Sequence, residues 1–484
     1  MNDTQQLTIG VVEGFYGVFY TFPERLDLIR FLGRHGGNLY IYAPKNDRQH
    51  RARWWEPYPE QVMIQFAVTV TTARAAGVRF CYAISPGGSI QYSSADDFNR
   101  LTAKLRGFYE IGVRAFSLMM DDNEPGLRHP ADSEQFATLP EAQASLANRV
   151  YEWLKRLNPA CTLSFVPAEY SGRAPFSDRL KTLGRLLHPD IDLFYTGPET
   201  CSARITAEDA RAFAQAVGRK PLIWDNYPVN DLSMQPELHL APLTGRSADL
   251  PDETKGFLFN PMVQAEASKI PLRTALAYCA DPAGYEPADA WQAGLEEIAG
   301  EDYAAPLRLL AQNTNLSCLG RNGQTLERLA VAATSAVVNG ELEAQAVREL
   351  EAYLTEIDEA TYTLKFRLEN LPLRANLLPW IEVLEHWMWM TRFSLNVLRA
   401  IQQSQPFGED LNRVNEYREA IRGHAKRIAS PALQTLSDYT IQQAHQSQCW
   451  LVHQNRFTQF HRMIFRAVSK TNTTTMPASL WRQK

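Results

Sequence analysis

Two adjacent aspartates are the most suggestive chemical feature of this chain of 484 residues. Asp121 and Asp122 directly follow the apolar run Leu118–Met119–Met120. Because successive side chains of a strand diverge, both carboxylates can approach one ligand from different sides. Two like charges this close favour one ionised group and one group that holds a proton. The pair therefore predicts an acid/base beside a charge stabiliser, and the alternative is an Asx turn or helix cap, since DDNEP is good turn chemistry.

A lysine ends another apolar run, within YIYAPKNDRQHR. Lys45 can donate to a hydroxyl or balance the carboxylates, and the alternative is a surface lysine that buries only its stem. A basic and aromatic patch follows it, made of His50, Arg51, Arg53 and Trp54–Trp55. This patch either borders a cleft or forms a solvated loop.

A third candidate segment is WDNYPVND, which contains Trp224, Asp225, Asn226 and Asp231. An aromatic ring can stack on a sugar, while amides and carboxylates can bind its hydroxyls. The segment predicts a sugar subsite, and the alternative is a buried Trp above a turn.

Several other chemistries find no support in the sequence. There is no H-E-x-x-H or comparable ligand cluster, so we expect no metal, and GVVEGFYG is not the G-x-G-x-x-G of a dinucleotide site. There is no G-x-S-x-G, and His50 joins no convincing Ser/His/Asp set. The six cysteines, at 81, 161, 201, 279, 318 and 449, form no C-x-x-C, so we expect reduced, mostly buried thiols. No cofactor is expected.

The elements that must position these residues follow a regular pattern. Eight short, nearly continuous apolar runs occupy 7–14, 38–45, 78–85, 115–122, 162–169, 192–199, 221–226 and 256–261. Amphipathic segments between and after them lie near 23–35, 59–75, 94–111, 136–157, 175–187, 205–217 and 262–280. This alternation predicts parallel strands covered by helices, closed into a (β/α)8 TIM barrel, with an open doubly wound sheet as the alternative.

In such a barrel the chemistry lies at the carboxyl ends of the strands. The residues at these ends are Gly14, Lys45, Ser85, Asp121–Asp122, Glu169–Tyr170, Gly197, Asn226 and Asn260. So many polar residues and glycines where apolar runs stop indicate a site.

The pattern changes after residue 282. Helical periodicity dominates near 286–299, 301–317, 324–338, 342–368, 373–404, 409–429 and 431–468, while strand-like runs disappear. We expect an all-α helical-bundle domain whose Trp and Met residues form its core. The predicted domains are the barrel at 1–282, the bundle at 283–470 and a flexible Ser/Thr-rich tail at 471–484.

The net charge and the lack of targeting signals argue against a nucleic-acid-binding, membrane or secreted protein. Lys plus Arg total 49 and Asp plus Glu total 54, a formal charge of −5, which gives no reason to expect nucleic-acid or anionic-membrane binding. No apolar stretch approaches the roughly 18–20 residues of a membrane span, and the N-terminus lacks the features of a signal peptide. We therefore expect a cytoplasmic protein.

Taken together, the motifs resemble glycoside hydrolase family 84, the β-N-acetylglucosaminidases that include the O-GlcNAcases and bacterial enzymes labelled hyaluronidase. In family order they are GVVEGFYG, YIYAPKNDRQHR, the double Asp, AEY at 168–170, YTGPE at 195–199, WDNYPVND and FNP. The resemblance implies retaining hydrolysis of terminal β-linked GlcNAc by substrate assistance, in which the sugar's acetamido oxygen forms an oxazoline. No covalent enzyme intermediate is needed, unlike the usual two-carboxylate scheme.

The resemblance also implies roles for single residues. Asp121 orients the acetamido N–H and stabilises charge, and Asp122 is the general acid and then the general base. Tyr170 bonds the acetamido oxygen, and Gly14 and Lys45 contact the sugar near its 3-hydroxyl. The remaining substrate-binding residues are Asn226 on the acetamido side, Asp231 and Asn260 at the outer hydroxyls, and Trp224, whose ring can stack on the sugar.

One departure and two alternatives accompany the resemblance. Asn123–Glu124–Pro125 replaces a more Ile/Asp-like continuation after the double Asp, which can alter aglycone preference. The alternatives are a conventional retaining glycosidase with Asp121 as covalent nucleophile, and a non-catalytic carbohydrate-binding barrel. Protein-linked GlcNAc, peptidoglycan fragments and chitin oligomers all fit as substrates, and the helical domain of the family can contribute to a homodimer or to the cleft wall.

Overall fold

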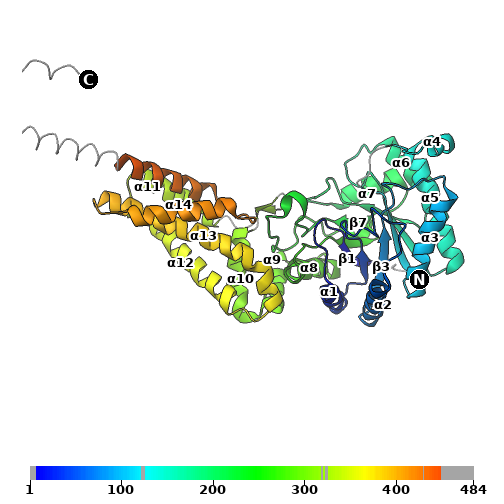
Figure 1. Ribbon diagram of the computed structural model, residues 1–484, viewed down its shortest axis with the longest axis horizontal. Coiled ribbons are helices and arrows are strands. Elements are labelled where there is room, and N and C mark those ends of the chain that lie inside the picture. Colours follow the sequence, from blue (N-terminus) through cyan, green and yellow to red (C-terminus); the bar gives the residue numbers. More distant parts are fainter. Residues whose placement is uncertain are drawn as a thin grey trace, which may run out of the picture. The chain divides into compact units, whose positions relative to one another are not determined.

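The computed structural model describes residues 7–121, 126–314, 325–428 and 430–447, and the backbone alone at 316–317 and 320–321. Its central feature is a closed barrel of eight parallel strands in sequence order (Figure 1). The strands are β1 Thr8–Glu13, β2 Leu39–Tyr42, β3 Arg79–Ile84, β4 Ala115–Met119, β5 Thr162–Val166, β6 Asp192–Tyr195, β7 Leu222–Asp225 and β8 Gly256–Phe259. The barrel closes where Thr8 of β1 pairs with Gly256 of β8. The predicted fold class is confirmed, and the open sheet is excluded.

Helices connect the strands and cover the barrel (Figure 1). They are α1 Phe22–Arg34, α2 Glu60–Ala75, α3 Ala95–Glu110, α4 Pro130–Gln135, α5 Leu139–Leu157, α6 Asp178–Leu186, α7 Ala207–Val217 and α8 Ala265–Ala280. Two short 3-10 helices, η1 Leu232–Met234 and η2 Leu250–Glu253, lie in the segment between β7 and β8. Each predicted helix of this half is present, with ends that differ by a few residues.

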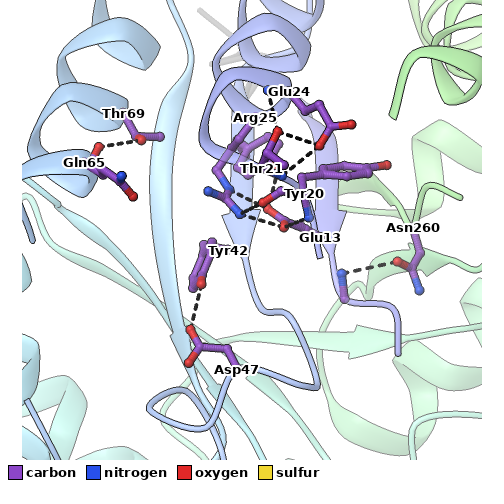
Figure 2. A network of polar contacts seen from close by, with 12 residues as sticks. Glu13, Tyr20, Thr21, Glu24, Arg25, Tyr42, Asp47, Gln65, Thr69 and Asn260 are labelled. Carbon is purple, nitrogen blue, oxygen red and sulfur yellow. Dashed lines mark hydrogen bonds and ion pairs between the residues drawn. The ribbon is translucent and has the colours of Figure 1, made fainter. Parts of the chain in front are cut away.

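The start of α1 shows how local sequence sets an element. Thr21 is the N-cap, and its hydroxyl accepts the N–H of Glu24 while the Glu24 carboxylate accepts the N–H of Thr21 at 2.8 Å (Figure 2). This capping box satisfies two helix-end donors that would otherwise lack partners. It starts α1 at the position from which Arg25 reaches back to strand β1.

Neighbouring side chains of β1 point to opposite sides of the barrel wall. Val12 belongs to the apolar cluster that fills the barrel, whereas Glu13 accepts two hydrogen bonds from Arg25, at 2.7 and 2.9 Å (Figure 2). The hydroxyl of Tyr40 donates to Glu13 at 2.6 Å, so this fully buried carboxylate is paired and hydrogen-bonded. Glu13 therefore holds β1, β2 and α1 together.

The helices after the barrel are α9 Pro287–Ala299, α10 Glu301–Thr314, α11 Thr325–Val338, α12 Gln345–Phe366, α13 Leu371–Gln402 and α14 Gly408–Gly423. The described residues form two compact units: those within 7–325, 357–384 and 425–428, and those within 326–356, 385–424 and 430–447. The domain boundary at 282/283 stays a prediction, and the tail at 471–484 lies outside the described residues. Trp380, Trp387, Met388 and Met390 are all buried, as expected for core residues.

One predicted helix after the barrel was too long. We expected it to cover 301–317, but α10 ends at Thr314. Residues Leu316–Ser317 (β9) instead pair antiparallel with Gly320–Arg321 (β10). The expectation that strands disappear after residue 282 was therefore wrong at this point. Two-residue strands are too short to leave an alternating pattern in a sequence.

Candidate active site

A cavity of about 300 Å³ opens at the carboxyl ends of the barrel strands. Among the described residues, every strand except β3 contributes to its lining, directly or through the segment that follows it. The lining residues are Gly14, Tyr16, Lys45, Asp121, Val166, Tyr170, Phe194, Thr196, Thr200, Cys201, Trp224, Asn226, Val229, Asp231, Leu232, Ser233, Met234 and Asn260. A concave, mostly apolar cavity with a few convergent polar groups is the usual form of a small-molecule site.

Lys45 and Asp121 form a buried ion pair in this cavity. The Nζ of Lys45 contacts Oδ2 of Asp121, and the two residues are only 7% and 6% exposed. The same Nζ lies 5.7 Å from the ring centroid of Trp224, within the range of a cation–π interaction. Lys45 is thus not a surface lysine but the partner of Asp121, and Asp121 is more than a turn residue.

The segment after Lys45 is anchored from several sides. Asp47 accepts hydrogen bonds from the hydroxyls of Tyr42, at 2.6 Å (Figure 2), and Tyr58, at 2.7 Å. Lys104 on α3 donates to the carbonyls of Gln49 and Glu56, each at 2.5 Å. Burial lowers the pKa of Lys104 to about 8. These contacts place Lys45 at the cavity floor instead of on a mobile loop.

His50 lies in the same anchored segment and is fully buried. Its Nδ1 lies 2.8 Å from the carbonyl oxygen of Ala83 on β3, and burial lowers its pKa to about 4. A neutral ring that donates from Nδ1 fits these surroundings. Trp54 is also buried, and its Nε1 donates to Ser89 at 3.0 Å, whereas Arg53 and Trp55 are exposed. The solvated-loop interpretation was therefore wrong for His50 and Trp54.

A chain of side-chain amides joins three strand ends. Oδ1 of Asn226 accepts from Nε1 of Trp224 at 2.8 Å and from Nδ2 of Asn260 at 2.9 Å. Oδ1 of Asn260 accepts the backbone N–H of Gly14 at 3.3 Å. Nδ2 of Asn226 donates to the carbonyl of Thr200 at 2.7 Å. Because each amide is held at both ends, its orientation toward the cavity is fixed before any ligand binds.

Asp231 ties the segment after β7 to the segment after β1. Its Oδ2 accepts the backbone N–H of Tyr16 at 2.7 Å. The hydroxyl of Tyr16 accepts from Nη1 of Arg51 at 3.0 Å. The neighbouring Leu232 has a φ of +49°, an uncommon value for a residue other than glycine, and lies exposed at the cavity. The wall formed by η1 is thus fastened directly to the EGFYG segment.

The remaining wall comes from β5 and β6. Tyr170 packs against the apolar cluster of the barrel, and its backbone carbonyl accepts the N–H of Thr196 at 2.8 Å. Phe194 and Trp224 meet edge to face, with ring centroids 5.7 Å apart. Aromatic rings therefore close the floor of the cavity beside the polar groups.

Asp225 does not line the cavity, because successive side chains of β7 point to opposite sides and the preceding residue, Trp224, points into it. It forms a buried ion pair with Arg246, whose Nε donates to Oδ2 of Asp225 at 2.8 Å. Arg246 also donates to the carbonyls of Ser202 and Ala203, at 3.1 and 3.0 Å. Asp225 thus fixes the segment after β6 that carries Thr200 and Cys201, without reaching the cavity.

The structure brings most of the predicted residues together. Those lining the cavity are Gly14, Lys45, Asp121, Tyr170, Trp224, Asn226, Asp231 and Asn260. Ser85, Glu169 and Gly197, which also end predicted strands, are not among the lining residues. Asp122 and residues 123–125 lie outside the described residues, so the position of the predicted acid/base stays a prediction.

Sequence reasoning missed several lining residues. Tyr16 and Thr196 stand inside quoted motifs, GVVEGFYG and YTGPE, but had no role assigned. Val166 and Phe194 belong to apolar runs and leave no polar signal. Cys201 was expected among mostly buried thiols, and it is half-buried and lines the cavity, whereas Cys81, Cys161 and Cys279 are buried free thiols. Across the described residues, no three His, Cys, Asp or Glu side chains gather to hold a metal ion.

A comparison with known families assigns the class of protein. Residues 9–312 match the family model described as beta-N-acetylglucosaminidase, which covers all of the barrel strands except Thr8 and all described cavity residues. The chain belongs to this family of glycoside hydrolases, glycoside hydrolase family 84, and the resemblance seen in its motifs is confirmed.

Individual relatives agree with this membership. Over 270 residues the chain is 36% identical to the Protein O-GlcNAcase of Rattus norvegicus and to that of Mus musculus. The match covers 55% of this chain but only 29% of each relative. Among solved structures, a mutant of the Thermobaculum terrenum O-GlcNAc hydrolase superposes with a TM-score of 0.84 at 29% identity, over 92% of this chain and 96% of that one. The structure titled CpGH84B superposes with a TM-score of 0.77 at 28% identity, over 89% of this chain and 76% of that one.

In the described part of the chain, no helix has the length and apolarity to cross a membrane.

Proposed function

We propose that this protein is a retaining exo-β-N-acetylglucosaminidase that removes terminal β-linked GlcNAc by substrate assistance. The observation that carries the proposal is the buried ion pair of Lys45 and Asp121 in a cavity that also holds Tyr170, Trp224 and two oriented asparagines. A carboxylate that an ammonium holds in place suits a reaction in which positive charge develops on a neutral sugar, because the carboxylate can stabilise that charge. The cavity volume, about 300 Å³, suits one sugar ring better than a long chain of sugars.

The proposed first step breaks the glycosidic bond. The carbonyl oxygen of the 2-acetamido group attacks C1, and the bond from C1 to the leaving oxygen breaks. Asp122 gives its proton to that oxygen, and Asp121 accepts a hydrogen bond from the acetamido N–H, whose nitrogen becomes positive as the oxazoline forms. Lys45 holds Asp121 in position for this contact. Tyr170 donates to the acetamido oxygen and turns it toward C1.

The proposed second step restores the enzyme. Water attacks C1 while Asp122 takes one of its protons, and the bond between C1 and the oxazoline oxygen breaks. Two inversions at C1 give retained configuration, and the acetamido group returns to its starting form. Asp122 is then protonated again, ready for the next substrate.

The other cavity residues are proposed to bind the sugar. Trp224 offers a ring face on the acetamido side, and Asn226 has a second N–H that can donate, since its first is held by Thr200. Asp231 and Asn260 bind the outer hydroxyls. Gly14 lets the sugar approach the backbone, near the amine of Lys45.

The decisive experiment compares aryl glycosides that differ at the 2-position of the sugar. We expect turnover of the aryl β-N-acetylglucosaminide and little turnover of the matching β-glucoside, since only the first carries the internal nucleophile. Replacing the acetyl methyl hydrogens by fluorine should lower kcat stepwise, because fluorine weakens the attacking oxygen. Equal rates on both sugars would instead support Asp121 as a covalent nucleophile. Binding of GlcNAc without any turnover would support the carbohydrate-binding alternative.

The natural substrate is proposed to be an O-GlcNAc-type glycoside, as the names of the curated relatives suggest. A GlcNAc-modified serine peptide should then be hydrolysed with a higher kcat/KM than chitobiose. The reverse order would favour a different GlcNAc glycan. The change at Asn123–Glu124–Pro125 predicts an altered aglycone preference. A homodimer through the helical domain stays a prediction, and so does a cytoplasmic location.

A further inference from the structure

A second cavity, of about 410 Å³, lies at the amino ends of β3, β4 and β5. Its walls come from the end of α2 and the turn into β3, from the turn between α3 and β4, and from the turn between α5 and β5. Because the barrel strands are parallel, this cavity and the proposed active site occupy opposite ends of the barrel. The two cavities share no lining residue, so a ligand in one does not compete directly with a ligand in the other.

The charged side chains that line this cavity are all positive. Arg74, Arg79 and Arg114 contribute three guanidiniums from three different segments, and no Asp or Glu is among the lining residues. The chain as a whole has a formal charge of −5, so this positive charge is a local concentration and not a property of the whole surface. Like charges around one hollow repel one another, and an anion between them would relieve that repulsion.

The acidic residues near the arginines do not line the cavity. Glu110 ends α3 directly before the turn that contributes to the walls, and its exposed side chain is not part of the lining. Asp192, at the start of β6, interacts with the charge of Arg79, but it also has Lys255 and Arg219 as cationic neighbours. The carboxylates around the cavity therefore leave its walls positive.

The three guanidiniums have free hydrogen-bond donors. Across the described residues, neither Arg74 nor Arg79 has a side-chain hydrogen bond or ion pair, and both residues are exposed. Arg114 is held in place, because its Nη1 donates to the carbonyls of Tyr109 and Val113, each at 2.8 Å, and its Cζ lies 3.9 Å from the centroid of the Tyr109 ring. A guanidinium has five N–H donors, so Nε and Nη2 of Arg114 leave three that these contacts do not use.

A phosphate group suits such a set of donors. Guanidinium groups bind phosphate oxygens through paired, charge-assisted hydrogen bonds, and a doubly charged phosphate can interact with more than one of them. Apolar side chains complete the walls: Val78 and Phe80 are buried, and Val70 and Ile111 are half-buried. These side chains favour a phosphate that carries an apolar body, because binding removes that body from water.

From these observations we propose that the cavity at the amino ends of β3, β4 and β5 is a second ligand site, which binds a small phosphomonoester with an apolar body through Arg74, Arg79 and Arg114. The site is separate from the sugar site and does not depend on the activity proposed above. None of its lining residues takes part in that mechanism.

The test uses inorganic phosphate, phenyl phosphate and phenyl sulfate as probes and the full chain, at about pH 8, where both phosphates are dianions. By calorimetry we expect a Kd on the order of 1 mM for inorganic phosphate, and a Kd about tenfold lower for phenyl phosphate, whose ring adds apolar contact. Phenyl sulfate carries one negative charge and should bind about tenfold more weakly than phenyl phosphate. Equal binding of the sulfate would overturn the selection for a phosphate.

Two variants locate the site on the chain. Arg74→Met keeps the apolar stem of an exposed helical side chain but removes its charge, and should raise the Kd of phenyl phosphate about tenfold, as should Arg79→Met. The matched control is Arg34→Met, since Arg34 is an exposed arginine in the last turn of α1, as Arg74 is in the last turn of α2. This control should leave the Kd unchanged. An equal loss in the control would show general attraction by the protein's charge and would overturn the proposal.

Two further measurements separate this site from the sugar cavity. A crystal of the wild type soaked with phenyl phosphate should show the phosphorus beside Arg74 and Arg79 and the ring against Phe80. Phenyl phosphate should also leave the KM for an aryl β-N-acetylglucosaminide unchanged, because the two cavities lie at opposite ends of the barrel. Competitive inhibition with a matching constant, or no binding of phenyl phosphate at about 10 mM, would overturn the proposal.

Discussion

The ring of Trp224 lies so close to Gly14 that any side chain at position 14 would have to displace it. A Cβ on residue 14 would stand 2.4 Å from Cζ2 and 2.6 Å from Cη2 of Trp224. The glycine therefore leaves room for the indole of Trp224, in addition to letting a bound sugar approach the backbone. Since Trp224 also donates to Asn226, displacing its ring would disturb the amide chain that reaches Gly14 itself.

Gly14→Ala should damage catalysis more than folding. The new methyl must push the indole aside, and a shift of roughly 1 Å in a positioning group can cost about 10²-fold in rate. We expect kcat/KM on an aryl β-N-acetylglucosaminide to fall by about that factor, with a loss of stability of about 1–3 kcal/mol from overpacking. Steady-state kinetics and urea unfolding measure the two effects.

The control for this variant is a glycine with open space around it. Gly107 of α3 has nothing within 4 Å of the place of a Cβ, so Gly107→Ala should leave activity unchanged and stability equal or slightly higher. The clash also predicts non-additivity. Trp224→Phe removes the two clashing atoms, so adding Gly14→Ala to it should cost much less than in the wild type. Strictly additive losses would contradict the clash as the cause.

Lys45→Met should strongly destabilise the protein. It leaves the Asp121 carboxylate buried without its cation, and breaking a buried pair by removing one partner costs roughly 3–5 kcal/mol. Denaturant unfolding measures this loss. The double variant Lys45→Met with Asp121→Leu should recover much of the stability while staying inactive, because no unpaired charge remains.

An exposed lysine–aspartate pair provides the matched control for Lys45→Met. Lys181 and Asp178 pair at 3.3 Å on the surface of α6, and their side chains are 48% and 97% exposed. Lys181→Met should change the free energy of unfolding by less than about 1 kcal/mol. A loss in Lys45→Met no larger than this would show that burial of the Lys45–Asp121 pair carries no energetic weight.

The barrel could be predicted because its strands are buried on both sides. Each strand from β1 to β8 therefore appears as a nearly continuous apolar run, and a helix-length segment follows each one. The ends were less certain, since runs such as 192–199 continue into polar loop residues after β6 stops at Tyr195. Strands of only two residues, such as β9 and β10, are too short to produce a recognisable hydrophobic pattern in the sequence.

Site residues could be predicted from the sequence only where a polar residue directly follows a strand. Lys45, Asp121 and Asn260 each follow an apolar run, so their position followed from the fold. The burial of His50 could not be foreseen, because its partner is the backbone carbonyl of Ala83, a group that every residue has. Cys201 was equally hidden, since the contacts of Arg246 that fix its segment come from distant parts of the chain.

Asp122→Ala should reveal the proposed acid/base through the leaving group. General acid catalysis contributes roughly 10²–10⁴-fold, so the rate on a poor leaving group should fall by that amount. A very acidic phenol needs no proton, so its release should suffer much less.

The control for Asp122→Ala must be chosen with care. Gly126→Ala near the same segment is unsuitable because the φ of Gly126 is +146°, and Asp132→Asn would break other contacts. The better control is Asp178→Ala, at an exposed position on α6, which should affect both substrates equally little. Unchanged rates of Asp122→Ala on both would rule out the role.

His50 should make stability depend on pH in the acid range. Burial lowers the pKa of His50 to about 4 in the folded protein, against an ordinary value of about 6.5 in the unfolded chain. Between these values the unfolded state binds more protons, so stability is present above about pH 6.5 and falls as the pH drops toward 4. The loss assigned to this one group is on the order of 3 kcal/mol.

His50→Asn tests this directly, because the Asn amide can keep a hydrogen bond to Ala83 but does not titrate. Carboxylates also contribute to acid unfolding, so the quantity to compare is the difference in unfolding free energy between wild type and variant. That difference should shrink steadily as the pH falls from 6.5 to 4. His445→Asn, at an exposed position, is the matched control for the loss of a histidine side chain. A difference for His50→Asn that stays constant over this pH range would mean that the buried ring does not resist protonation.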